Sequence, residues 1–180
     1  MHTRIRNHTR EAHARLEHRM VSRIRRIKDK EEYHGLLALF YGFYKPVEDS
    51  LGTTFASDSL LKDLGVAPAS LYKGWVAPRH PVGARYVLEG SMHGGPYIAA
   101  MIERQVGERQ LECPLPFYFL KRAAASERWN GFVELLETVP AGEHAHVLDT
   151  ALSTFDHFNH WIDHYDKSRH HLAAAAAQEL

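Results

Sequence analysis

The sequence predicts an all-α protein, a multi-helix bundle in a single domain. Apolar residues recur every three to four positions through most of its 180 residues, which is the period of an α-helix. No segment shows the strict alternation that is typical of strands, and no internal repeat or change in composition marks a domain boundary. A chain of this length fits one domain. We expect this domain over residues 1–170, followed by a tail at residues 171–180.

The composition is that of an ordinary globular protein, with 44% hydrophobic and 24% charged residues. The 22 basic and 22 acidic residues give a formal net charge of zero, which argues against a nucleic-acid partner. No apolar run is long enough to span a bilayer, and the opening segment MHTRIRNHTR lacks the apolar core of a secretory signal. We therefore expect a cytoplasmic protein without a membrane span.

The first predicted helix runs from Arg4 to about Arg26. Its inward stripe consists of Ile5, Thr9, Ala12, Leu16 and Met20. His13 lies within this stripe, whereas His8 and His18 project to the opposite face. A histidine on an apolar face is either a core residue with satisfied hydrogen bonds or a ligand, and this helix alone does not decide between the two.

The second predicted helix starts near Asp29 and has the strongest amphipathic pattern in the chain. Its apolar positions are Tyr33, Leu36, Leu37, Phe40, Tyr41, Tyr44 and Val47. Pro46 lies inside this helix and is expected to bend or locally break it. One or two short helices follow in residues 57–73, the first closed by Gly65 and the second by Gly74.

Residues 82–106 are predicted to form a helix of unusual glycine content. At about 100° per residue, one side carries Val87, Gly90, Ser91, Gly94, Gly95, Ile98 and Ile102. Each interior glycine costs about 1 kcal/mol relative to alanine, and Pro96 adds roughly 3 kcal/mol. Two interpretations remain open. The backbone forms a wall against a bound planar ligand, or the small residues allow close packing against another helix.

Two more helices are predicted over residues 127–138 and 143–165, and Trp129, Phe132, Val133 and Leu136 lie on the inward face of the first. The buried stripe of the second contains Leu148, Ala151, Leu152, Phe155, Phe158, Ile162 and Tyr165. Before them, Pro114 and Pro116 forbid a continuous helix. Cys113 lies in the same segment and is the only cysteine, so we expect neither an intramolecular disulfide nor a thiolate metal cluster. No neighbouring base supports a role for this thiol as a nucleophile.

Four segments, in this order, resemble the haem oxygenase family, especially its bacterial biliverdin-producing members. They are TREAHARLE in the first helix, EEYHGLLALFYGFYKPVE in the second, YVLEGSMHGG in the glycine-rich helix, and the late pattern of Thr154, Phe155 and Trp161. The resemblance covers roughly residues 3–165. It implies a haem oxygenase-like multi-helix bundle.

The resemblance also implies roles for individual residues. His13 would be the axial metal ligand of the haem iron, with Glu17 as partner to its other ring nitrogen and Arg6 near a haem propionate. The catalytic wall on the opposite side would be formed by Gly90, Ser91 and Gly94. Further haem contacts would come from Val87, Gly95, Ile98, Phe155 and Phe158. The alternatives are that Glu17 and Arg6 are solvated surface residues and that the two phenylalanines belong to an ordinary core.

The activity implied is oxidative cleavage of haem, which is substrate and cofactor at once, to biliverdin, carbon monoxide and ferrous iron. Oxygen would be the oxidant. No glycine fingerprint of a flavin or nicotinamide site follows a strand, so electrons would come from a ferredoxin or a reductase. Ser91 stands where animal members of the family have an aspartate, which leaves the proton route unassigned. The basic residues Arg23, Arg25, Arg26 and Lys28 either dock an acidic donor or form a solvated face.

Two other functions remain as alternatives. A haem carrier or sensor would use the same pocket without turnover, with His93 as a second axial ligand. On a straight helix, however, His93 projects away from the glycine face. A non-haem diiron oxidase of the same fold would use the DxxxHxxxH spacing of Asp156, His160 and His164. The helical projection argues against this second alternative, because it places His157, His160 and His164 opposite the buried stripe and toward solvent.

Overall fold

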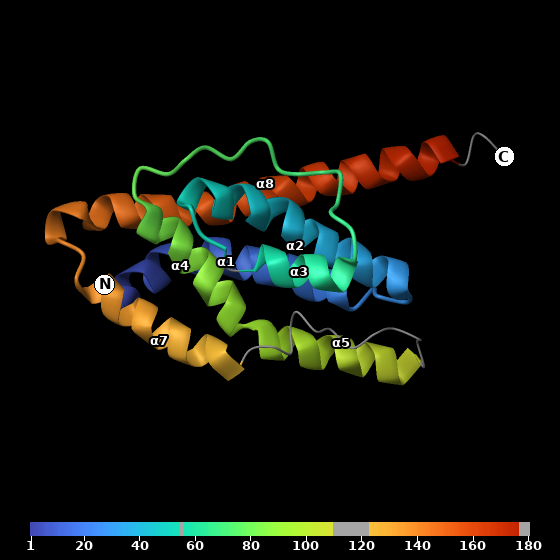
Figure 1. Ribbon diagram of the computed structural model, residues 1–180, viewed down its shortest axis with the longest axis horizontal. Coiled ribbons are helices and arrows are strands. Elements are labelled where there is room, and N and C mark those ends of the chain that lie inside the picture. Colours follow the sequence, from blue (N-terminus) through green and yellow to red (C-terminus); the bar gives the residue numbers. More distant parts are fainter. Residues whose placement is uncertain (55, 110–122, 177–180) are drawn as a thin grey trace.

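The computed structural model describes residues 1–54, 56–109 and 123–176, and none of these residues forms a strand. The prediction of an all-α fold is therefore confirmed (Figure 1). The helices, in chain order, are α1 (His2–Ile24), α2 (Lys30–Leu51), α3 (Ser57–Leu64), α4 (Pro81–His93), α5 (Gly95–Arg109), α7 (Ala123–Glu137), the short 3₁₀ helix η1 (Ala141–Glu143) and α8 (His144–Ala176).

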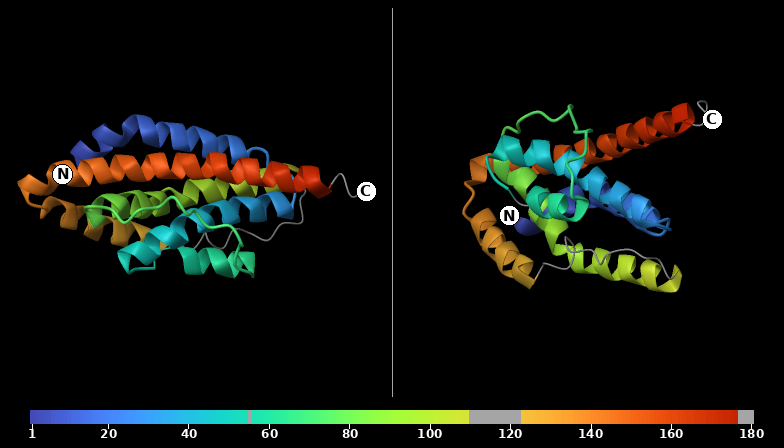
Figure 2. Two further views of the ribbon diagram at one scale, coloured as in Figure 1. Left: turned by 90° about the horizontal axis from the view of Figure 1, so that it is seen from above. Right: turned by 45° about the vertical axis from the view of Figure 1, so that its right-hand side comes forward.

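The long helix α8 lies alongside α1 and α4 and is the main support of both, as Figure 2 shows for α1. Helix α3 packs on α2, and α7 packs mainly against α4. The core joins aromatic residues of α2 and α8. Phe43 and Phe158 stack with ring centroids 4.2 Å apart, and the buried Trp161 donates its indole N–H to the carbonyl of Leu39 at 2.8 Å.

The stripes predicted for α1 and α2 are buried as expected, because amphipathic helices turn their apolar face to the core. Helix α2 begins at Asp29, whose side chain caps it by accepting the backbone N–H of Glu32 at 2.8 Å. The predicted break at Pro46 is wrong, since α2 continues through it. Proline lacks the N–H that would bond to Gly42, and the backbone N–H of Tyr72 takes that carbonyl instead at 2.8 Å.

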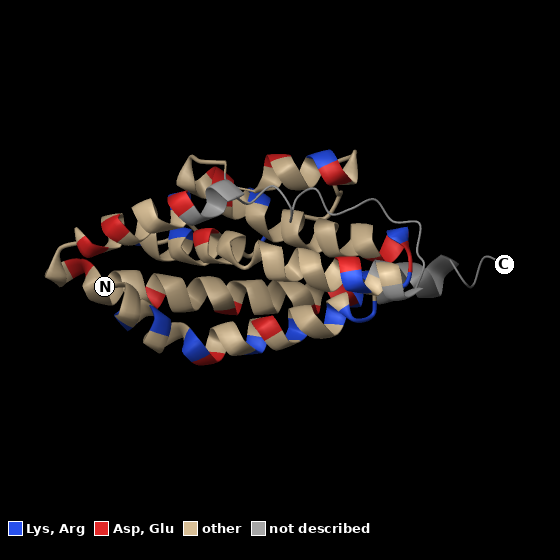
Figure 3. Ribbon diagram, turned by 90° about the horizontal axis from the view of Figure 1, so that it is seen from below, with Lys and Arg blue, Asp and Glu red and all other residues tan. Residues whose placement is uncertain are grey.

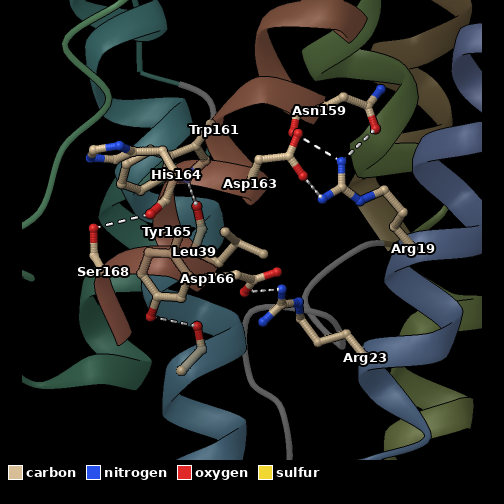
Figure 4. A network of polar contacts seen from close by, with 11 residues as sticks. Arg19, Arg23, Leu39, Asn159, Trp161, Asp163, His164, Tyr165, Asp166 and Ser168 are labelled. Atoms are coloured by element: carbon tan, nitrogen blue, oxygen red, sulfur yellow. Dashed lines mark hydrogen bonds and ion pairs between the residues drawn. The ribbon is translucent and has the colours of Figure 1, made fainter. Parts of the chain in front are cut away.

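Ion pairs join α1 to α8 along much of their contact. Figure 3 shows basic residues recurring along α1. The contacts are Arg15 to Asp156 at 3.8 Å, Arg19 to Asp163 at 2.5 Å and Arg23 to Asp166 at 2.5 Å. Arg19 also donates to the backbone carbonyl of Asn159 at 3.0 Å (Figure 4). These contacts fix the register of α1 on the helix that carries the aromatic core.

The predicted single helix over residues 82–106 is instead two helices. Helix α4 ends at His93, Gly94 separates it from α5, and the chain changes direction there (Figure 1). The proline lies in the first turn of α5, where its missing N–H costs little, so Pro96 begins a helix rather than bending one.

The remaining predicted elements agree with the structure in most respects. Helix α3 ends at Gly65, which has a positive φ of 76°, but residues 67–74 form no second short helix. Helix α8 extends beyond its predicted end at Tyr165, because the alanine-rich segment that follows has high helix propensity. The segment with Cys113, Pro114 and Pro116 lies outside the described residues. Within the residues that the structure describes, no helix combines the length and apolar character needed to cross a membrane.

Helix α4 lies directly on α8 at Gly83. A Cβ atom at Gly83 would lie 2.5 Å from the carbonyl oxygen of Val147 and 2.8 Å from the backbone nitrogen of Ala151. Contacts this short to backbone atoms cannot be relieved by a side-chain rotation, so close packing through a small residue occurs here.

We expect Gly83→Ala to lower the free energy of unfolding by about 1–3 kcal/mol, because the added methyl group forces α4 away from α8. Gly131 in α7 is the matched control, since a Cβ there would meet no atom within 4 Å among the described residues. Gly131→Ala should be neutral or stabilising by up to about 1 kcal/mol. Urea unfolding of the two variants tests this difference, and equal effects would contradict it.

The segment after α3 is held against α8 by a hydrogen bond between side chains. The hydroxyl of Tyr72 lies 2.7 Å from Nδ1 of His157, and His157 is half-buried against Trp75. The prediction that His157 faces solvent is therefore wrong. Burial lowers the pKa of His157 below its ordinary value of 6.5. The charge of His160 lowers this pKa further, and Asp156 opposes the shift.

The lowered pKa of His157 means that the unfolded chain binds a proton more readily than the folded one. Neutral His157 therefore stabilises the folded state above pH 6.5, and this stabilisation is lost as the pH falls through the pKa of His157 in the folded protein. His157→Gln removes the titration, so the stability of the wild type relative to this variant should fall between about pH 7.5 and pH 5.5. Urea unfolding at both pH values measures it, and a constant difference would refute the effect.

Candidate functional site

A cavity of about 640 Å³ lies between α1 and α4 and is completed by side chains of α2, α5, α7 and α8. This volume falls within the range of roughly 300–1,000 Å³ that is typical of small-molecule sites. Its lining includes ten of the predicted site residues: Arg6, His13, Glu17, Val87, Gly90, Ser91, Gly94, Ile98, Phe155 and Phe158. Gly95 does not line it, because the chain turns into α5 at that residue.

The α4 wall of the cavity is bare backbone at two positions. Among the described residues, a Cβ atom at Gly90 would make ordinary contact with the ring of Trp129 at 3.6 Å, and one at Gly94 would meet only the carbonyl oxygen of Ser91 at 3.6 Å. The φ of −73° at Gly94 is open to any residue. Neither close helix packing nor backbone conformation therefore requires these glycines. What their small size provides is space in the cavity.

The α1 wall presents His13. Its imidazole meets the ring of Phe155 edge to face at 5.5 Å, and its Nδ1 lies 4.0 Å from a carboxylate oxygen of Glu17. The side chain of His13 is 60% exposed, so it lies at the edge of the buried stripe and not within it as predicted. With Nδ1 turned toward Glu17, Nε2 is the nitrogen that can bind a ligand in the cavity.

The two ends of the cavity differ in polarity. His2, Arg6 and Arg10 line it on the N-terminal side of His13. On the other side the lining is largely apolar and includes Leu16, Met20, Val21, Ile24 and Met101. The arrangement suits an amphipathic ligand that carries negative charge at one end.

Two hydroxyl groups meet at the α4 wall. The buried Tyr44 of α2 donates to Oγ of Ser91 at 2.6 Å, and Ser91 donates to the carbonyl of Leu88 at 2.7 Å. Both side chains line the cavity. Nearby, burial raises the pKa of Tyr86, with the charge of Arg6 opposing the shift, so this phenol stays protonated at neutral pH.

Several lining residues were missed by sequence reasoning. Tyr44 was assigned only to the core, and Trp129 only to the inward face of its helix. Both side chains do face inward, but nothing in a single sequence shows that these rings also border a cavity. The position of Arg10 could have been found, because it lies one helical turn after Arg6. His93 also lines the cavity, although its helical projection pointed away from the glycine face.

Phe155 and Phe158 fit both interpretations that the sequence left open, since each is buried in the core and also lines the cavity.

The acidic and histidine residues of α8 that suggested an iron site have other contacts. Asp163 pairs with Arg19, and His157 binds Tyr72. Across the described part of the chain, no group of three or more His, Cys, Asp or Glu side chains is arranged to hold a metal ion. The non-haem iron alternative thus gains no support from this cluster.

The fold and the cavity define an all-helical protein that can enclose a planar, partly anionic ligand between its first helix and a bare backbone wall. A comparison with protein-family models matches residues 1–74 to the family described as Heme oxygenase. The matched segment contains α1, α2 and α3, and the all-α fold is consistent with the match. His13 lies inside the matched segment, whereas α4 lies outside it. No curated protein sequence and no solved structure matches the chain.

We expect Gly94→Leu to fill the cavity without unfolding the protein. A Cβ at this position meets only one described atom within 4 Å, and the backbone conformation suits leucine. The melting temperature should therefore change little, while saturable binding of haemin, followed by absorption spectroscopy, should be lost or weakened at least tenfold, or by about 1.4 kcal/mol. Unimpaired binding would show that the α4 wall does not contact the ligand.

Proposed function

We propose that this protein binds haem in the cavity between α1 and α4 and cleaves it to biliverdin, carbon monoxide and ferrous iron, as bacterial biliverdin-producing haem oxygenases do. Molecular oxygen would be the oxidant, and a separate donor would supply electrons. One observation carries the proposal. An imidazole, that of His13, faces a wall from which Gly90 and Gly94 remove side chains. The match of residues 1–74 supports the same family.

The residues of the α1 wall fit the proximal side of a haem. Nε2 of His13 would ligate the iron, and Glu17 at 4.0 Å from Nδ1 would orient the ring. The edge contact with Phe155 restricts rotation of the imidazole. At the polar end, Arg6 and Arg10 would bind the propionates, since a guanidinium matches a carboxylate in charge and geometry.

The opposite wall fits the side on which oxygen reacts. Bound haem supplies the iron at which oxygen is reduced and the ring that is cleaved. Gly90 and Gly94 leave room above the ring, and the apolar part of the lining would exclude bulk water once haem is bound. Ser91, held by the hydroxyl of Tyr44 at 2.6 Å, is the polar group of this wall that can donate or pass a proton. This pair would serve in place of the aspartate of animal relatives.

Electrons would come from a ferredoxin or a reductase, and the exposed basic residues Arg25, Arg26 and Lys28 beyond α1 are the surface we propose for an acidic donor. Arg23 is a weaker candidate, because it is paired with Asp166. The absence of a tightly bound flavin or nicotinamide and a cytoplasmic location stay predictions.

A haem carrier or sensor without turnover is the second candidate function. The observation that favours it is His93, which lines the cavity on the wall opposite His13. If His93 ligated the iron, the site for oxygen would be closed. Such a protein would show a low-spin ferric spectrum and a reduced haem that persists in air.

The decisive activity experiment follows the visible spectrum of the protein with one equivalent of haemin in air, after addition of a reductant and catalase. Decay of the Soret band together with growth of a broad red biliverdin band is the result expected for the enzyme. A Soret band that survives reduction would favour the carrier or sensor.

We expect His13→Ala to abolish the normal axial ligation of haem, seen as a shifted Soret band and loss of biliverdin formation. Exogenous imidazole should partly restore both, because it can occupy the space left by the side chain. His8 lies on α1 but does not line the cavity, so His8→Ala is the matched control and should behave as the wild type. A His13→Ala protein with an unchanged haem spectrum would refute the assignment.

A further inference from the structure

A buried carboxylate joins α4 to α7 next to the cavity. Glu89 is 2% exposed and accepts hydrogen bonds from Nε of Arg85 at 3.1 Å and from Nε of Arg128 at 2.8 Å. Arg85 lies on the same helix as Glu89, and Arg128 lies on α7. Burying a carboxylate is costly unless it is paired, so this cluster depends on both arginines. The chemistry proposed above gives Glu89 no role.

The residues that follow Glu89 and Arg128 in the sequence form part of the cavity wall. Gly90 follows Glu89, Trp129 follows Arg128, and the Trp129 ring lies 3.6 Å from the position of a Gly90 Cβ. The same indole stacks on His93 with centroids 5.8 Å apart and contacts Tyr86 at 5.6 Å. Trp129 therefore covers the polar end of the cavity from the side of α7.

The position of α7 depends mainly on α4. Beyond the Glu89 to Arg128 pair, the guanidinium of Arg85 lies 5.0 Å from the ring centroid of Phe132, a cation–π contact between the same two helices. Both contacts use charged groups of α4 near Gly90, since Glu89 is its neighbour in sequence and Arg85 lies five residues before it. A change at Glu89 is therefore transmitted directly to the register of Trp129.

We propose that Trp129 is a ligand-contacting residue at the haem edge and that Glu89 is the positioning residue that holds it there through Arg128. The identity of the ligand rests on the function proposed above, but the coupling between Glu89 and Trp129 does not. Glu89→Gln keeps the shape of the side chain and removes its charge. The guanidinium of Arg128 then loses its ionic partner on α4, and the indole loses its fixed place over Gly90.

The test uses protein labelled with 5-fluorotryptophan. Each of the three tryptophans then gives its own ¹⁹F resonance, and these are Trp75, Trp129 and Trp161. Trp129→Phe assigns the relevant one. In the ligand-free protein, Glu89→Gln should shift or broaden the Trp129 resonance and leave the other two unchanged. Addition of paramagnetic haemin should broaden Trp129 most, because the other tryptophans do not line the cavity, whereas gallium protoporphyrin should shift it without this broadening.

Haem dissociation provides the second readout. Transfer of haem to an excess of apomyoglobin should be about tenfold faster from both Glu89→Gln and Trp129→Ala than from the wild type. The double variant should be no faster than Trp129→Ala alone, because both changes act on one contact. If the effects of the two substitutions on the rate of haem release added up in the double variant, Glu89 would act on haem by another route, and the proposal would be overturned.

Glu48 supplies the matched control, since it is 1% exposed, lies away from the cavity and accepts hydrogen bonds from the backbone at the start of α3. Glu48→Gln should destabilise the fold without moving the Trp129 resonance or the rate of haem release. If Glu89→Gln does not fold, Arg128→Gln breaks the same pair from its more exposed side.

An unchanged Trp129 resonance in these variants, or equal shifts of all three tryptophans, would refute the positioning role. Failure of haemin to bind the wild type would refute the proposed function and the contact of Trp129 with haem. It would leave the coupling between Glu89 and Trp129 measurable in the ligand-free protein.

Discussion

The space between α1 and α4 depends on three glycines in or directly after α4. Gly83, near the start of this helix, allows its backbone to lie directly on α8, where a Cβ would be 2.5 Å from a carbonyl oxygen. At Gly90 and Gly94 no comparable contact exists among the described residues, and the missing side chains leave space in a cavity of about 640 Å³. The same helix therefore packs closely on α8 near its start and borders the cavity near its end.

The opposite wall is kept in place by contacts that do not touch the cavity. Ion pairs from Arg19 and Arg23 hold α1 on α8, and α8 is itself anchored in the aromatic core through Trp161. Exposed ion pairs are individually weak, but with the pair of Arg15 and Asp156 there are three along this helix contact, and together they favour one register. This register places His13 beside Phe155 and opposite the glycines. The geometry on which ligand binding depends is therefore set by residues away from the ligand.

Two polar groups at or beside the cavity have defined partners. The hydroxyl of Tyr44 is bound to Ser91, and the carboxylate of Glu89 is bound between two arginines. Arginines at one end and methionines and aliphatic residues at the other leave one favourable orientation for a planar ligand with two carboxylates. For the haem that we propose as ligand, the open α4 wall would lie over the ring and His13 under it. Binding, orientation and access for oxygen would then follow from one arrangement of the helices that line the cavity.

The sequence by itself determined the all-α class, the buried stripes of α1 and α2, and the glycine positions of the α4 wall, because helical periodicity is a local property of the chain. It also indicated His13, through spacing and a family resemblance. Only the tertiary structure decided that the glycine segment breaks at Gly94, that α2 continues through Pro46, and which rings border the cavity. Contacts such as that of Trp129 with Gly90 join residues distant in sequence, so no local pattern encodes them.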